Sequence, residues 1–314
     1  MKNLIIDTDP GIDDGVALLF ALGSRELEVR AITTVSGNLT ADRCSVNARK
    51  VLELAGASTI PVARGLQTPL VRPYPRDPFS HGDDGLGDLS LPAPSIPEDP
   101  RFAADVIVDT VDRYAGDISI IGIGPLTNIA LALMKDPELP RKVSELIVVA
   151  GAYGFDSTNS LRATGDNPVS EWNVYVDPEA AEKVYGAGFN LTAIGVDIAT
   201  HDSIALTDAH RSALRASTRK SAWFLANVVE FVERRDFRAC CALIDSLAIA
   251  VALDPTLVST QRLRVGIETQ GTLTLGQTVV DRRNHFAWTH LPQINVVCAV
   301  DAQRFLQLLL DAVL

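Results

Sequence analysis

Four aspartates lie close together near the start of the chain, in the segment Asp7-Thr8-Asp9-Pro10-Gly11-Ile12-Asp13-Asp14. No lysine or arginine lies within this segment, so the four negative charges repel one another unless a positive charge compensates them. A hard divalent cation prefers carboxylate oxygens and would supply that charge. The simpler alternative is an acidic helix start, but capping a helix requires one aspartate rather than four. The segment therefore predicts a site for a divalent cation.

The position of these acids in the predicted fold supports that interpretation. They follow a short apolar run, residues 4–6, which is typical of a buried strand, and an apolar helical pattern extends over residues 16–22. The acids thus lie where a strand passes into a helix. In open α/β sheets, ligands bind at this edge of the sheet.

The rest of the chain predicts the elements that position this edge. Short β-branched runs predict strands at residues 4–6, 29–35, 118–121, 146–149 and 191–196, and helical patterns lie between them at 43–55, 103–114, 126–134 and 178–185. After residue 207 the pattern is more helical, at 222–235, 242–253 and finally 302–313, with late strands expected at 265–267, 278–280 and 294–299 in a parallel or antiparallel arrangement. The alternation predicts an α/β fold with an open, mostly parallel sheet flanked by helices and a more helical C-terminal part. Since no repeat or long linker interrupts the chain, we expect residues 1–314 to form one domain.

Composition limits the classes of function. The 314 residues include 47% hydrophobic and 21% charged residues, as in ordinary globular proteins. The net charge of −11 argues against nucleic-acid or anionic-membrane binding, which require basic surfaces. No apolar run approaches the ~20 residues that span a bilayer, and Met1-Lys2-Asn3 leads directly into a strand, without room for a signal peptide. The four cysteines lack metal-type spacing, so we expect a cytoplasmic protein with reduced thiols.

Further polar groups follow the other predicted strands. Ser36-Gly37-Asn38 follows the second strand, Gly124-Pro125-Leu126-Thr127-Asn128 follows the strand at 118–121, and Glu171-Trp172-Asn173 ends a long irregular stretch over residues 151–170. Residues 64–100 form a second such stretch, and loops of this length are usually functional or mobile. Each polar group alone is more often a turn residue or a helix cap than a ligand. Their convergence on one sheet edge predicts a functional site there.

In their order along the chain, these motifs resemble those of the inosine-uridine-preferring nucleoside hydrolases, which cleave the N-glycosidic bond of ribonucleosides. The resemblance covers most of the chain, and its most specific part is residues 7–14. The other matching motifs are His81-Gly82-Asp83-Asp84-Gly85-Leu86-Gly87, Pro125-Leu126-Thr127-Asn128, Glu171-Trp172-Asn173, Asp177-Pro178-Glu179-Ala180-Ala181 and Ile244-Asp245-Ser246-Leu247-Ala248.

The resemblance implies a role for each matching residue. Asp9, Asp14 and Asp245 would bind Ca2+ through carboxylate oxygens, together with the backbone carbonyl of Thr127; with Asp14 bidentate, this gives about five of the 6–8 oxygens usual for Ca2+. Asp9 would also act as the general base on the metal-bound water. The remaining matches would bind substrate: Asp13, Asn38, Glu171 and Asn173 at the ribose hydroxyls, and His81 in the base pocket.

This arrangement suits N-glycoside cleavage. The transition state resembles an oxocarbenium ion, so positive charge develops on the sugar, where carboxylates stabilise it. A site whose polar groups bind the ribose hydroxyls leaves one of them unpaired when a hydroxyl is missing. We therefore expect a strong preference for ribonucleosides over 2′-deoxyribonucleosides.

The chain departs from the family at the position that serves the base. Many members have a histidine directly before the late metal-binding aspartate, which is proposed to protonate the departing base, whereas this chain has Ile244. Either the Cys240-Cys241 pair or aromatic stacking could compensate, and the candidate aromatic residues are Tyr74, Phe79, Trp223 and Phe237. The segment before Glu171 is one residue shorter than in the family, so Asn159, Asp166 and Asn167 all stay candidates for a sugar contact. The base preference also stays open, and the family resemblance implies a homodimer or homotetramer.

Two other functions are compatible with parts of the sequence. A phosphatase of the haloacid dehalogenase type would use Asp7 as nucleophile and Asp9 as general acid with Mg2+, but the later motifs expected for it are lacking. A nucleoside- or ribose-binding homologue with weak or lost turnover is the second alternative, because Ile244 cannot donate a proton. Gly122-Ile123-Gly124 only weakly suggests dinucleotide binding, since Pro125 follows and a third glycine is missing.

Overall fold

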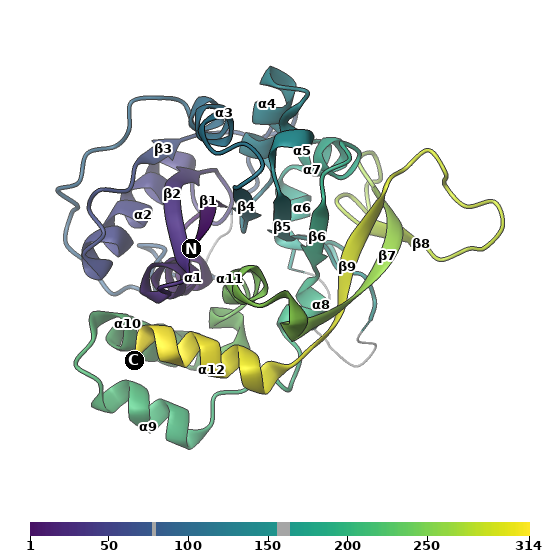
Figure 1. Ribbon diagram of the computed structural model, residues 1–314. Helices are drawn as coiled ribbons and strands as arrows, with labels where there is room; N and C mark the ends of the chain where they lie inside the picture. The colour runs from purple at the N-terminus through teal and green to yellow at the C-terminus, as the bar shows by residue number, and fades with distance from the viewer. Residues whose placement is uncertain (77–79, 156–163) are drawn as a thin grey trace.

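The computed structural model describes residues 1–76, 80–155 and 164–314. Their strands form a nine-stranded sheet in the order β3-β2-β1-β4-β5-β6-β9-β7-β8, with helices on both faces (Figure 1). The strands are β1 (Lys2–Thr8), β2 (Leu27–Thr34), β3 (Val62–Arg64), β4 (Ser119–Gly122), β5 (Glu145–Val149), β6 (Leu191–Ile194), β7 (Val258–Ile267), β8 (Thr278–Asp281) and β9 (Gln293–Val300). The predicted α/β class with a mostly parallel sheet is confirmed.

Two helical layers enclose the sheet. The helices are α1 (Ile12–Gly23), α2 (Ala41–Ala55), α3 (Ala103–Arg113), α4 (Thr127–Lys135), α5 (Leu139–Lys142), α6 (Trp172–Val176), α7 (Pro178–Tyr185), α8 (Val196–Ala199), α9 (Asp208–Ala216), α10 (Lys220–Glu233), α11 (Ser246–Leu253) and α12 (Ala302–Val313), with 3-10 turns η1 (Ala239–Ala242) and η2 (Pro255–Leu257). On one face, α1 contacts α2, α10, α11 and α12; on the other, α4 contacts α3 and α7. None of the described helices combines the length and the apolar character needed to cross a membrane.

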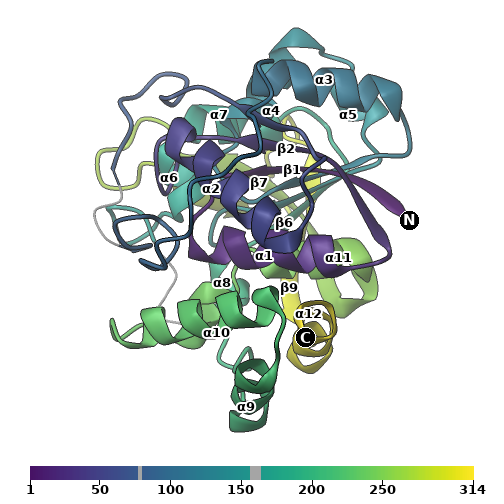
Figure 2. The ribbon, with the colours of Figure 1, turned by 90° about the vertical axis from the view of Figure 1, so that its left-hand side faces the viewer.

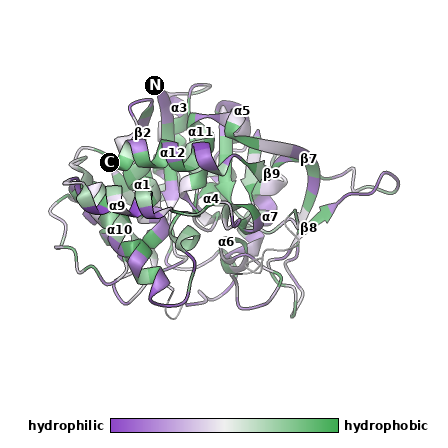
Figure 3. Ribbon diagram, turned by 90° about the horizontal axis from the view of Figure 1, so that it is seen from below, coloured by the Kyte–Doolittle hydropathy of each residue, from purple (hydrophilic) through white to green (hydrophobic). Residues whose placement is uncertain are grey.

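The apolar residues of β1 show why this strand is central. Leu4 and Ile6 belong to the core on the α1 side, whereas Ile5 belongs to the core on the α3 side. Both faces of the strand are therefore buried, which explains its continuous apolar run. Helices α1 and α11 are apolar almost throughout (Figure 3) because they lie between the sheet and the outer helices α10 and α12 (Figure 2).

The strand order creates a crevice at the carboxyl end of β1. From β1 the chain builds outward through β2 and β3 on one side, and later through β4, β5 and β6 on the other. The connections that leave β1 and β4 therefore diverge, and ligands bind at such a point in open α/β sheets. Three of the predicted polar groups follow β1, β2 and β4, at this edge of the sheet.

Several predicted boundaries were wrong. Helix α1 begins at residue 12 rather than 16, so Asp13 and Asp14 lie in its first turn; the Asp14 side chain accepts the backbone N–H of Gly11 and starts the helix. The strand predicted to reach residue 196 ends at Ile194, and Val196 begins α8. Residues 242–253 do not form one helix, because η1 ends at Ala242 and α11 begins only at Ser246.

The late strands pair in two ways. Strand β9 is parallel to β6 and antiparallel to β7, and β7 is antiparallel to β8. Strand β7 covers ten residues, seven more than predicted, because residues 259–262 are exposed and polar and lack the apolar signature of a buried strand. The short elements β3 and α5 were not predicted, since three- and four-residue elements carry little periodicity.

Candidate active site

Asp9 lies just beyond β1 and is fully buried. Its Oδ2 accepts the backbone N–H of Asn38 at 2.7 Å, whereas none of the described residues donates a hydrogen bond to Oδ1. A Cβ atom at Gly37 would lie 2.0 Å from Asp9 Oδ2, and one at Gly124 would lie 2.6 Å from Oδ1. Glycine is therefore required at both positions for the loops after β2 and β4 to approach this carboxylate.

Asp14 is held by four donors from the surrounding turn. Thr8 Oγ1 and the backbone N–H of Asp9 donate to its Oδ1, and the backbone N–H of Gly11 and the side-chain amide of Asn38 donate to its Oδ2. Because β1, the turn and α1 all take part, the geometry of this carboxylate is fixed before any ligand binds.

Asp245 reaches the same place from the C-terminal part of the chain. It directly precedes α11, makes no capping hydrogen bond to that helix, and is buried. One carboxylate oxygen from each of Asp13, Asp14 and Asp245 lies within 4.8 Å of the others. The first and last acidic motifs of the sequence therefore meet in one cluster.

Burial and like charge act together on these acids. Burial first, and then the charges of Asp13, Asp14, Asp9 and Glu171, raise the pKa of Asp245 well above its usual value. Burial, followed by the charge of Asp14, raises the pKa of Asp9 in the same direction. Since the charges that act on both groups are those of other carboxylates, the cluster is a strong acceptor for a positive charge.

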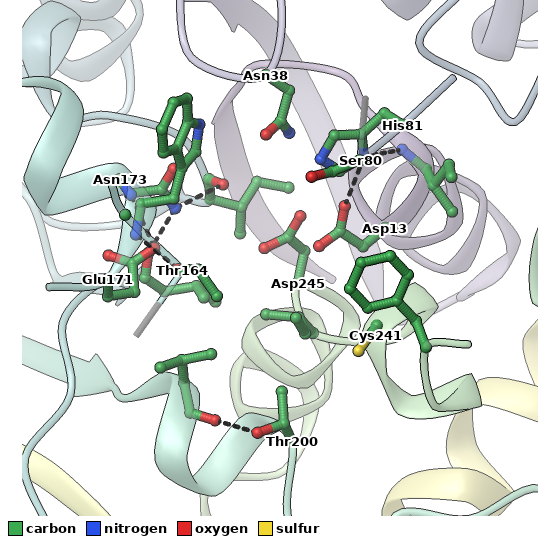
Figure 4. Close-up of a pocket in the computed structure, with 18 of the residues that line it drawn as sticks. Asp13, Asn38, Ser80, His81, Thr164, Glu171, Asn173, Thr200, Cys241 and Asp245 are labelled. Carbon is green, nitrogen blue, oxygen red and sulfur yellow. Dashed lines mark hydrogen bonds and ion pairs between the residues drawn. The ribbon is translucent and has the colours of Figure 1, made fainter. Parts of the chain in front are cut away.

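A cavity of about 340 Å³ opens beside this cluster (Figure 4). This volume lies within the range of small-molecule sites. Six of the predicted site residues line it, namely Asp13, Asn38, His81, Glu171, Asn173 and Asp245. Asp9 and Asp14 are not among the described lining residues, because they lie buried beneath the cavity. Thr127 begins α4, and its hydroxyl donates to Asp177 at 2.6 Å.

Glu171 and Asn173 form one side of the cavity, at the start of α6 (Figure 4). The carboxylate of Glu171 accepts the backbone N–H groups of Gly151, Asn173 and Val174, and burial raises its pKa to about 7 despite these bonds. The side-chain amide of Asn173 donates to the carbonyls of Ile123 and Val149, beyond β4 and at the end of β5. Both side chains are thus held by the ends of the central strands.

The opposite side carries His81 and Cys241, and an apolar wall completes it (Figure 4). Four apolar lining residues come from α8, α10 and the segment around η1: Val196, Val232, Phe237 and Ile244. The other apolar residues that line the cavity are Ile12, Ile123, Val149 and Trp172. The sequence did not indicate Val196, Val232 or the nearby Thr200, because their spacing is that of ordinary core residues. Cys240 is buried in the core, so of the pair only Cys241 reaches the cavity.

Two of the candidate aromatic residues are not part of this wall. The Tyr74 hydroxyl donates to the carbonyl of Gly37, and Trp223 is exposed on α10; neither is among the described residues that line the cavity. Phe237 does line it, and Phe79 lies outside the described residues.

The three candidates for a further sugar contact do not all lie at the cavity. Asp166 lines the cavity, whereas the amide of Asn167 donates to the carbonyl of Leu275 and its oxygen accepts from Val169 and Ser170. Asn167 therefore stabilises its own loop. Asn159 lies outside the described residues.

Asp7 has a different environment from the other acids. Thr33 Oγ1 and Asn128 Nδ2 donate to its Oδ1 at 2.5 and 2.8 Å, and burial raises its pKa to about 7. It is not among the described residues that line the cavity. Among the described residues, Asp7 is held by Thr33 and Asn128 and is not part of the acidic cluster of Asp13, Asp14 and Asp245.

Comparisons with known proteins agree with the fold and the site. Residues 4–307 match the family described as inosine-uridine preferring nucleoside hydrolase. The chain is 36% identical to an inosine-uridine preferring nucleoside hydrolase of Leishmania major over 99% of this chain and 97% of that protein. It is 35% identical to the pyrimidine-specific ribonucleoside hydrolase RihA of Citrobacter koseri over 98% of this chain and 96% of that protein.

The structure is similar to that of a purine-preferring ribonucleoside hydrolase from Gardnerella vaginalis, with a TM-score of 0.87, 32% identity and coverage of 99% of this chain and 98% of that one. The fold and the site thus define an enzyme of the N-glycosyl hydrolase class. The chain belongs to the inosine-uridine preferring nucleoside hydrolase family. Hydrolysis of ribonucleosides, as the motifs predicted, is therefore its activity, and neither alternative function is favoured.

Proposed function

We propose that this enzyme hydrolyses the N-glycosidic bond of ribonucleosides to ribose and free base with Ca2+ bound at the acidic cluster and with Asp9 as the general base. The observation that carries the proposal is the meeting of Asp14 and Asp245, which are distant along the chain, beside one cavity. Buried carboxylates at this distance repel one another when charged, so a bound cation would stabilise their deprotonated form.

The donor atoms suit a hard cation. The cluster offers carboxylate oxygens only, and the part of the chain that the structure describes leaves Asp9 Oδ1 buried without a hydrogen-bond donor. Asp9, Asp14 and Asp245, with the carbonyl of Thr127, would hold Ca2+, which prefers such oxygens to nitrogen or sulfur. When bound, the ion would raise the acidity of the attacking water and neutralise the cluster.

Each group of residues then has a separate role in the reaction. Asp9 accepts the proton of the water that attacks C1′ of the ribose. Asp13, Asn38, Glu171 and Asn173 bind the ribose hydroxyls, and the fixed side chains of Glu171 and Asn173 orient the sugar. The carboxylates around the sugar stabilise the positive charge that develops on it in the transition state.

The base binds on the side of His81 and the apolar wall. A flat, largely apolar ring suits Val232, Phe237 and Ile244, which line that side. The relatives' names differ between purine and pyrimidine nucleosides. Inosine and uridine are therefore both substrates to assay.

Asp9→Asn tests the assignment of the general base. The amide keeps an oxygen at the cluster but cannot accept a proton, so kcat for ribonucleosides should fall by about 10³-fold. Calcium binding should weaken but stay measurable by isothermal titration calorimetry, because the amide oxygen can still bind the ion, and inhibitor binding should persist in calcium-saturated enzyme. Asp109→Asn, at an exposed carboxylate on α3, is the matched control and should keep normal kinetics. Turnover of Asp9→Asn near the rate of the unaltered enzyme would refute this role.

Family membership also leads us to propose a cytoplasmic enzyme that acts as a homodimer or homotetramer and binds neither nucleic acid nor membranes. The charge of −11 supports the last two points. Sedimentation equilibrium of the purified chain tests the assembly, and a monomer at micromolar concentration would contradict it.

A further inference from the structure

The backbone carbonyl of Thr127 differs from the other proposed Ca2+ ligands, because a carbonyl moves only when its chain moves. Thr127 is the first residue of α4, and the residue before it, Leu126, has no polar side chain with which to cap the helix. The first turn of α4 therefore lacks the usual local anchor of a helix start. Its position depends on what the side chains of that turn contact.

Asp177 holds the first of these side chains. Its carboxylate is fully buried, and its Oδ2 accepts the Thr127 hydroxyl at 2.6 Å and the backbone N–H of Leu70 at 2.9 Å. Its Oδ1 accepts the backbone N–H of Ala180 at 3.0 Å and so caps α7, which lies beside α4 (Figure 1). One carboxylate thus joins α4, α7 and the long connection between β3 and α3.

Asp7, in β1, holds the next side chain of the turn. The side-chain amide of Asn128 donates to Asp7 Oδ1 at 2.8 Å and to the carbonyl of Thr34 at 3.0 Å, and the side chains of Asp7 and Asn128 are fully buried. A Cβ atom at Gly65 would lie 1.9 Å from Asn128 Oδ1, so glycine allows the amide to pack closely there. The strand that leads to Asp9 therefore also holds α4.

The segment that these contacts hold passes beside Asp9. At its start, the backbone N–H of Ile123 donates to the backbone carbonyl of Asp7 at 2.8 Å. A Cβ atom at Gly124 would lie 2.6 Å from Asp9 Oδ1, so the chain approaches this carboxylate closely. Residues 123–128 are thus tied to Asp7 at both ends, by its backbone and by its side chain, and they pass Asp9 between these two points.

The two side-chain contacts act on adjacent residues. Successive residues of an α-helix point about 100° apart around its axis, so Thr127 and Asn128 anchor the first turn in two directions. Neither Asp7 nor Asp177 is among the described residues that line the cavity or form the acidic cluster. Each carboxylate therefore acts on the site through the residues that it holds.

We propose that Asp7 and Asp177 are positioning residues for the Ca2+ site: through Asn128 and Thr127 they fix the first turn of α4, and with it the Thr127 carbonyl. This inference rests on the function and the Ca2+ site proposed above. The affinity of an oxygen site for Ca2+ depends on its rigidity as well as on its charge. A carbonyl that is already held in place costs less to order when the ion binds, so these contacts raise the affinity. The proposal also gives a role to Asp177, the first residue of a motif that the reaction itself does not use.

The test removes each contact and leaves every proposed ligand in place. Thr127→Val deletes the hydroxyl that binds Asp177 but keeps the branched shape and the backbone carbonyl, and Asn128→Leu deletes the amide that binds Asp7. Both carboxylates keep other donors, so both variants should fold. We expect each variant to bind Ca2+ about 10-fold more weakly than the unaltered chain, as measured by isothermal titration calorimetry without substrate.

Two further variants separate positioning from stability. Thr127→Ser keeps a hydroxyl that can donate to Asp177, so it should recover most of the affinity that Thr127→Val loses. Ser24→Ala removes a buried hydroxyl that donates to the carbonyl of Phe20 at 2.7 Å, at the opposite end of α1 from the acidic cluster. The Tm of metal-free Ser24→Ala should also fall, but its Ca2+ affinity should stay unchanged.

Three results would overturn the proposal in whole or in part. Unchanged Ca2+ affinity in both Thr127→Val and Asn128→Leu, with a lower metal-free Tm, would show that the two contacts are purely structural. A loss in one variant alone would overturn the role of the other carboxylate. An equal loss in Ser24→Ala would attribute the effect to stability. If the unaltered chain bound no Ca2+, the proposed metal site itself would fail, a result distinct from the other three.

Discussion

The two sides of the cavity are constructed differently. On the proposed sugar side, Asp14 is held by backbone donors of the turn after β1, and Asn173 is held by the carbonyls beyond β4 and at the end of β5. On the base side, the lining is mostly apolar and comes from α8, α10 and the segment around η1. This difference supports the proposal that rigid polar groups bind the sugar and that an apolar wall binds the base.

The largest expected effect concerns the 2′-hydroxyl of the substrate. Because buried polar groups on the sugar side are left unpaired by a deoxyribose, kcat/KM for 2′-deoxyinosine should be about 10⁴-fold below that for inosine. Steady-state assays of free base release measure this ratio. Comparable turnover of the two nucleosides would contradict the proposal that the polar side of the cavity binds the ribose hydroxyls.

A smaller effect is expected on the base side. Phe237→Ala removes part of the apolar wall, so kcat/KM for inosine should fall by about 10-fold through KM, while inhibition by ribose stays unchanged. Trp223→Ala is the matched control, because Trp223 is exposed on α10 and does not line the cavity within the described part of the chain. A change in ribose affinity in Phe237→Ala would show that the two sides are not separate.

The smallest effect is a shift in thermal stability. Burial and like charge raise the pKa values of Asp9 and Asp245 in the metal-free protein. A carboxyl whose pKa is raised in the folded state stabilises the fold when it is protonated. Its contribution to the folding stability therefore declines as the pH rises above the pKa that the carboxyl has in the unfolded chain. The metal-free enzyme should therefore lose stability between pH 5 and pH 8.

Calcium binds the deprotonated carboxylates, so it should raise the Tm more at pH 8 than at pH 5. At a concentration about 100-fold above Kd the stabilisation is about 2.7 kcal/mol. Differential scanning fluorimetry with calcium or a chelator measures both shifts. An equal or larger calcium effect at pH 5 would argue against a cluster of repelling carboxylates.

The same comparison explains what the sequence could predict. The turn after β1 was predicted because its function depends on residues that are adjacent in the chain: an apolar strand, four aspartates and an apolar helix. Asn38, Glu171 and Asn173 were found because they follow other strands of the same sheet. Their roles could be assigned only through the family resemblance, since asparagine and glutamate after a strand usually form turns.

The base side could not be predicted in this way. Phe237 was one of four candidate aromatic residues and could not be singled out, and Val232 was not indicated, because both have the spacing of core residues. Only the packing of α10 and η1 beside α1 brings them to the cavity. The break between η1 and α11, which places Asp245 before a helix rather than within one, was also missed because the apolar pattern continues through it. Contacts between distant segments leave no local signal.

Calcium titration of the unaltered enzyme and of Asp245→Asn, followed by isothermal titration calorimetry, tests the central claim most directly. If aspartates that are distant along the chain share one ion, the unaltered chain should bind a single Ca2+, and the variant should bind it at least about 10-fold more weakly. Absence of calcium binding, or equal affinity in the two proteins, would contradict the account.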